Sequence, residues 1–153
     1  MPETIDIGEQ LYDMTLHFTS NEDFGITMEA IRGGEPIPPA GARFDVAVAG
    51  ECTGKLAGTV NAVDYIVMRA DGLVQLHIHG SIETVDGARI SFSAVGTSEP
   101  NESTGLNDIR ENVVLHSASP AYAWVNTISV WAKGAVNPAT GQLLLKGYAA
   151  ASN

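Results

Sequence analysis

The sequence predicts an all-β protein, folded as a single closed antiparallel β-barrel of about eight or nine strands in one domain spanning residues 1–153. Apolar residues recur with period two in short runs, which is the pattern of half-buried strands. Sixteen glycines and seven prolines are spread along the chain and separate these runs. The long meander from residue 56 to residue 96 favours a barrel over a sandwich.

The strand pattern can be followed along the chain. In 11–19, Tyr12, Met14, Leu16 and Phe18 share one face. The run 26–32 ends at a Gly-Gly pair, and a proline-rich loop that cannot pair in a central strand follows it. A glycine-rich stretch, 50–58, bends the chain between later strands. The expected strands are 11–19, 26–32, 43–48, 56–69, 73–84, 88–96, 122–133 and 143–149.

The segment 97–119 differs from the rest. It opens with polar residues and glycine, and only 106–115 has the composition for one or two helical turns. A connection of this length in a compact domain is usually a functional lid or a disordered excursion. We therefore expect a long connection here.

Composition and charge exclude several classes of function. Eight Lys and Arg against 18 Asp and Glu give a net charge of −10, which repels nucleic acid and anionic membrane surfaces. No apolar run is long enough to span a bilayer, and the acidic N-terminus lacks the order of a signal peptide. The single cysteine, Cys52, is expected as a small buried residue. A cytoplasmic location follows as the expectation.

Two Asp-Gly pairs, at 71–72 and 86–87, lie between alternating runs and indicate hairpins. If both turns have two residues, Asp64 lies opposite His79 and shares a face with Phe92. We place this face in the lumen because Asp64 interrupts an otherwise apolar row and an isolated carboxylate there needs a reason. A buried Asp–His pair can hold one proton ready to give or take. It can equally be a structural hydrogen bond.

The run 119–126 suggests a pocket wall. Strand alternation would bring Tyr122, Trp124 and Asn126 together, offering aromatic surface and hydrogen-bonding groups, although aromatic residues also serve simply as core. We predict Asp64, His79 and Tyr122 as catalytic. The predicted substrate-binding residues are His77, Trp124, Asn126, Phe92, Ile66, Tyr12 and Met14.

No metal and no cofactor are expected. His77 and His79 would point the same way, but no third ligand is evident. The face opposite Asp64 then lies outside the barrel, where Val74, Leu76, Ile78 and Ile82 would form an exposed aliphatic stripe. A second copy of the chain is the usual cover for such a patch, so we expect a homodimer or higher homo-oligomer.

A set of short motifs, in order, resembles a known family. These are Gly41-Ala-Arg43, Gly50, Gly54, Gly58, Val63-Asp-Tyr65, Arg69-Ala-Asp-Gly72, Glu83-Thr-Val-Asp-Gly87 and Tyr122-Ala-Trp-Val-Asn126. They are similar to a bacterial and fungal family of unknown function whose small barrel is related to allene oxide cyclase. The resemblance implies a calycin-type barrel with a central cavity, commonly self-associated. It also implies that Asp64, Tyr122, Trp124 and Asn126 are family-typical positions.

The chain departs from the family pattern at Tyr65, where members often have Trp, at Ala49-Gly50, where they have a double Gly, and at Thr127, where they have a basic residue. The resemblance further implies that such a barrel, where it acts as an enzyme, tends to handle apolar small molecules without a cofactor.

Two functions stay open. The first is a cofactor-independent lyase, isomerase or cyclase acting on a small apolar oxygenated molecule, an epoxide or enone of terpenoid or polyketide type. The second is a non-catalytic barrel that binds or carries such a molecule.

Overall fold

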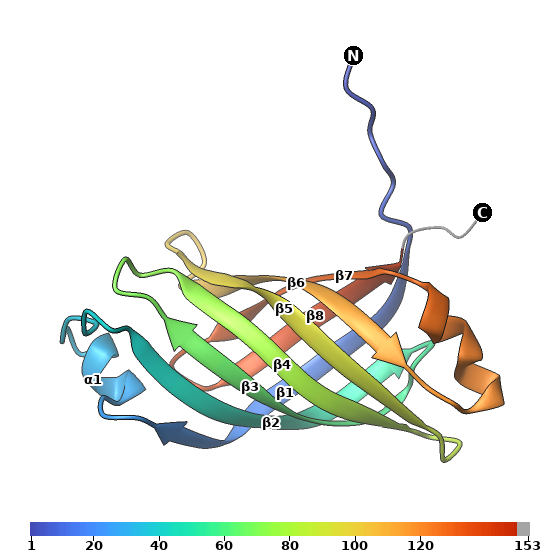
Figure 1. Ribbon diagram of the computed structural model, residues 1–153, viewed down its shortest axis with the longest axis horizontal. Coiled ribbons are helices and arrows are strands. Elements are labelled where there is room, and N and C mark those ends of the chain that lie inside the picture. The colour runs from blue at the N-terminus through green and yellow to red at the C-terminus, as the bar shows by residue number, and fades with distance from the viewer. Residues whose placement is uncertain (150–153) are drawn as a thin grey trace.

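Residues 1–149 are described by the computed structural model, and they form a closed barrel in which each strand pairs antiparallel with its neighbours (Figure 1). The pairing of the first strand with the last closes it. The predicted fold class is confirmed. The strands are β1 (Glu9–Asp23), β2 (Ala42–Gly54), β3 (Gly58–Met68), β4 (Val74–Thr84), β5 (Arg89–Asn101), β6 (Leu106–His116), β7 (Val130–Asn137) and β8 (Gln142–Ala149).

Two short helices lie at opposite ends of the barrel (Figure 1). Helix α1 (Met28–Arg32) joins β1 to β2, and the Thr27 side chain caps it by accepting a hydrogen bond from the Ala30 N–H at 3.0 Å. The 3₁₀ helix η1 (Pro120–Thr127) joins β6 to β7 and contributes the fully buried Val125 to the core. Neither helix in residues 1–149 has the length and apolar character of a membrane span.

Both hairpins around β4 differ from the expected two-residue turns. Arg69 pairs with Leu73, and Thr84 pairs with Ala88, so each loop has three residues. The last loop residue, Gly72 or Gly87, has φ near +90°, as in a type I turn followed by a left-handed residue. Each register therefore differs by one residue from the prediction, which turns every side chain of β4 to the other face.

The corrected register changes the position of the aliphatic stripe. Leu76, Ile78 and Ile82 are buried inside the barrel, whereas His77 and His79 are exposed on its outer surface. Asp64 pairs with Ile78 rather than with His79. The placement of the stripe outside is thus wrong, and the prediction of a homo-oligomer loses the observation on which it was based.

Three predicted elements are also corrected. The segment 26–32 contains α1 rather than a strand, because Thr27 caps a helical turn. The segment 97–119 is not a loose connection, since it holds the end of β5 and all of β6. The predicted strand 122–133 is η1 followed by β7, and Ser119-Pro120 marks the helix start, because proline is favoured in the first helical turn.

Candidate functional site

The lumen of the barrel contains a small cavity of about 20 Å³, enough space for about one water molecule. Its wall is almost entirely apolar, apart from two carboxyl groups and one phenol. The lining residues are Tyr12, Met14, Leu16, Val48, Ala62, Asp64, Ile78, Phe92, Ala94, Glu111, Val113, Leu143 and Leu145.

Asp64 provides the first carboxyl group, from the middle of β3. The side chain is 7% exposed, and one carboxylate oxygen accepts a hydrogen bond from the His77 backbone N–H at 3.1 Å. The regular β3–β4 pairing is interrupted beside this contact, between Asp64 and Val67. Burial raises the pKa of Asp64 to about 6, although the His77 hydrogen bond opposes the rise.

Glu111 provides the second carboxyl group, from β6. Its neighbours across the strands are Gly96 and Ala132, whose small size leaves room for the longer side chain. Glu111 is 3% exposed. Burial, and secondarily the charge of Asp64, raises the pKa of Glu111 to about 8. Within the described residues, Glu111 Oε1 is a buried side-chain oxygen that has no hydrogen-bond partner.

Glu111 was not among the predicted site residues, although the sequence contains a signal for it. Ile109, Val113 and Leu115 alternate as an apolar row that Glu111 interrupts, as Asp64 interrupts the row of β3. This alternation was not interpreted as a strand, because 97–119 was expected to be a loose connection.

Aromatic and thioether side chains complete the cavity wall. Tyr12, Met14 and Phe92 were predicted to bind substrate, and all three line the cavity. The ring of Tyr12 lies against Gly147, where a Cβ atom would be 2.2 Å from the ring. Burial, and then the charges of Glu111 and Cys52, raises the pKa of Tyr12 above its ordinary value, so the phenol stays protonated. Ile66 is buried but lies outside the cavity lining.

Tyr122 and Trp124 do not reach the lumen. Because they belong to η1 and not to a strand, they line an open groove of about 1060 Å³ at that end of the barrel. The Tyr122 hydroxyl donates a hydrogen bond to Asp86 at 2.9 Å, and Asp86 also accepts one from the Thr84 hydroxyl. These contacts attach η1 to the β4–β5 hairpin.

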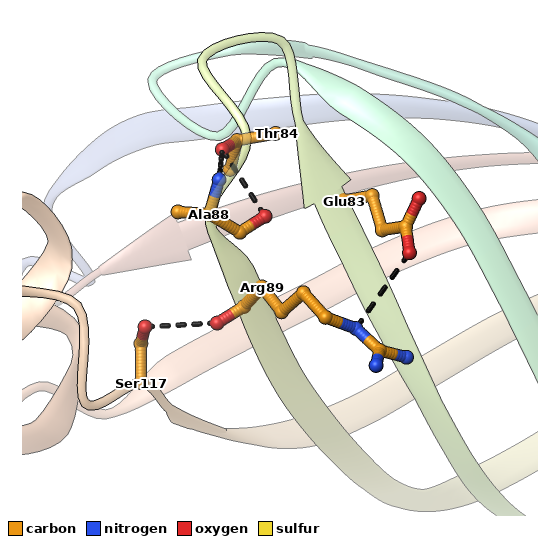
Figure 2. Close-up of polar contacts among 5 residues, drawn as sticks. All are labelled: Glu83, Thr84, Ala88, Arg89 and Ser117. Atoms are coloured by element: carbon orange, nitrogen blue, oxygen red, sulfur yellow. Dashed lines mark hydrogen bonds and ion pairs between the residues drawn. The ribbon is translucent and has the colours of Figure 1, made fainter.

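Asn126, near the C-terminal end of η1, bonds this helix to Ser117, which follows β6. Its side-chain amide accepts from the Ser117 N–H at 2.9 Å and donates to the Ser117 carbonyl at 2.8 Å. The Ser117 hydroxyl in turn donates to the Arg89 carbonyl, beside the Arg89–Glu83 ion pair and the Thr84–Ala88 contacts (Figure 2). Asn126 therefore has a structural position here, outside the cavity to which it was assigned.

Asn126→Ala should lower the free energy of unfolding by about 1–3 kcal/mol, since it leaves two partly buried backbone groups of Ser117 unpaired. Urea denaturation measures this loss, and the exposed Asn112→Ala, on β6, serves as the matched control. Equal midpoints for the two variants would contradict the structural assignment of Asn126.

No group of three or more His, Cys, Asp or Glu side chains within residues 1–149 has an arrangement that could hold a metal ion. In the lumen, Asp64 and Glu111 are set in an apolar wall and have raised pKa values. Chemically, such a pair can donate and accept protons at neutral pH.

Known proteins with the same fold have little sequence in common with this chain. A Clostridium acetobutylicum protein of unknown function is 22% identical, with a TM-score of 0.75, and the match covers 94% of this chain and 98% of that one. A conserved Rhodopseudomonas palustris protein of unknown function is 17% identical, with a TM-score of 0.77 and coverage of 99% and 100%. An enzyme from Penicillium herquei is 16% identical, with a TM-score of 0.59 and coverage of 97% and 99%.

No curated protein matches the chain. The profile of one protein family matches residues 14–150, which include every strand from β2 to β8 and both carboxyl groups of the lumen. The chain therefore belongs to the family described as "Protein of unknown function (DUF3237)".

Proposed function

We propose that this barrel is a cofactor-independent acid–base enzyme, a lyase, isomerase or cyclase that acts in its lumen on a small apolar oxygenated molecule. One observation carries the proposal. Two buried carboxyl groups line the same apolar cavity, and their pKa values, about 6 for Asp64 and about 8 for Glu111, lie on either side of neutrality. Titratable pairs whose environments separate their pKa values are the usual source of acid and base roles.

The two pKa values assign the roles. At pH 7 Glu111 is mainly protonated and donates its proton to the substrate oxygen, which assists cleavage of the C–O bond of an epoxide or polarises an enone carbonyl. Asp64 is mainly ionised and removes a proton from the substrate. The proton count then balances, because one proton leaves Glu111 and one arrives at Asp64. Transfer from Asp64 back to Glu111 through the water-sized space restores the starting state.

Other cavity residues support this chemistry. The aromatic faces of Tyr12 and Phe92 stabilise positive charge that develops on the substrate, an effect worth up to about 2 kcal/mol in a dry site. Trp124 and Tyr122, which were predicted to form the pocket wall, lie in the groove at the η1 end instead. Glu111 takes the part expected of His79, which is exposed on the outer surface.

Substrate binding requires the lumen to widen, because the cavity holds about one water molecule. Met14 is the lining residue best able to move, since its unbranched thioether side chain adapts to different shapes. The proposal places the reaction in the cytoplasm, where the buried free thiol of Cys52 stays reduced.

The test is turnover of a panel of epoxides, enones and lactones, with products detected by mass spectrometry. Glu111→Gln and Asp64→Asn should each lower the rate by about 10²–10⁴-fold, the usual contribution of a general acid or base. His79→Ala, on the outer surface, should keep the full rate. Unchanged turnover in both carboxyl variants would refute the mechanism, and tight binding with no product would instead identify a carrier.

A further inference from the structure

The outer surface of β4 carries two histidines that are unrelated to the lumen chemistry. His77 and His79 are two residues apart, so both project from the same face of the strand. Their Nε2 atoms share a hydrogen bond of 3.1 Å, in which the tautomer decides which ring donates, and the ring centroids are 4.8 Å apart with an angle of 60° between the planes. Both side chains are exposed, so this contact lies at the solvent-exposed surface.

We propose that His77 and His79 bind a divalent cation of the late first transition row, such as Zn²⁺, Ni²⁺ or Cu²⁺, through their Nε2 atoms. Bonds from imidazole nitrogen to such ions are about 2.0–2.1 Å long, and a 3.1 Å separation of the two nitrogens then gives an angle of about 100° at the ion. That angle lies between those of square-planar and tetrahedral coordination. Water molecules complete the coordination.

The strand partners of the pair on β5 are uncharged, and the Arg43 guanidinium near Tyr65 is already paired with a carboxylate. Across β5, the residues paired with His77 and His79 are Val95 and Ser93. Tyr65 packs against His77, with ring centroids 6.5 Å apart. The guanidinium of Arg43 lies over the Tyr65 ring and is paired with Asp45 at 3.1 Å. The net charge of −10 further favours a cation over an anion.

This site can be tested separately from the proposed function. The ring of His77 points outward, whereas its backbone N–H bonds to Asp64. Alanine at position 77 keeps that backbone hydrogen bond, so the lumen carboxyl group retains its partner when the ring is removed. His17, on β1, is an exposed histidine on another strand and provides the matched control.

The experiment is titration calorimetry of tag-free protein with Ni²⁺, Zn²⁺ and Cu²⁺, each alone, at about pH 7.5, because protons compete with metal ions for histidine ligands at lower pH. Wild type and His17→Ala should bind one ion per chain with equal affinity. His77→Ala and His79→Ala should each bind at least about 10-fold more weakly, since the second ligand acts at high effective concentration. With Cu²⁺, the electron paramagnetic resonance spectrum of wild type should show coupling to two nitrogens. Equal affinities for all four proteins, or no binding by wild type, would overturn the proposal.

Discussion

Ile82→Lys should prevent the barrel from folding. Ile82 is fully buried in the lumen, between Val60 of β3 and Ile90 of β5, with no charged side chain opposite it. An unpaired ammonium group there costs about 3–5 kcal/mol, in addition to the apolar burial that is lost. The sum is comparable with the whole stability of a domain, about 5–15 kcal/mol.

Circular dichroism and urea denaturation measure this effect. The matched control is Ser91→Lys, which puts the same side chain on the exposed face of β5 next to Ile90. The control should fold with a midpoint close to that of wild type. If Ile82→Lys also folds with an unchanged midpoint, the side chain is outside the barrel and the register described for β4 is wrong.

Glu111→Gln should stabilise the barrel increasingly as the pH rises. The pKa of Glu111 is about 4.5 in the unfolded chain and about 8 in the folded one. Because the folded-state pKa is raised, the stability associated with the neutral acid is fully present below about pH 4.5. It is lost as the pH rises toward 8. Glutamine has nearly the same shape and cannot ionise, so the variant avoids this loss.

The size of the effect follows from the two pKa values. Each unit between them is worth about 1.4 kcal/mol, so the variant should gain up to about 4–5 kcal/mol over wild type by pH 9 and almost nothing at pH 4. Urea denaturation across this pH range measures the difference. The exposed Glu99, paired with Arg110 on the surface, gives the control Glu99→Gln, whose difference from wild type should stay small at every pH. A pH-independent difference for Glu111→Gln would contradict the burial of an ionisable group.

The fold was largely predictable because the period-two pattern depends only on which residues are buried. The register was harder, since Asp71-Gly72 and Asp86-Gly87 fit both a two-residue turn and a three-residue loop that ends in a left-handed glycine. The predicted β3–β4 and β4–β5 registers are each wrong by one residue, and the two shifts cancel, so the predicted alignment of β3 with β5 is correct. For this reason Asp64 and Phe92 were correctly placed in the lumen, whereas the β4 residues between them were inverted.

The candidate site was predicted only in part for the same reason. Asp64, Tyr12 and Met14 lie on strands whose parity was correct. His79 was wrongly placed in the lumen because the predicted faces of β4 were inverted. Tyr122 was wrongly placed because its segment forms η1 rather than a strand. The partner of Asp64 lies three strands further around the barrel, on β6. No local spacing in the sequence joins Asp64 to Glu111, and only closure of the barrel brings them to one cavity.

The central claim is that Glu111 carries a proton in the folded barrel at neutral pH. Nuclear magnetic resonance of the side-chain carboxyl carbon, in protein labelled with ¹³C at glutamate, measures this directly, and Glu111→Gln identifies the signal. We predict that the Glu111 carbon titrates near pH 8 and is mainly in the protonated form at pH 7. Titration of that signal at the ordinary glutamate value, near pH 4.5, would contradict the account.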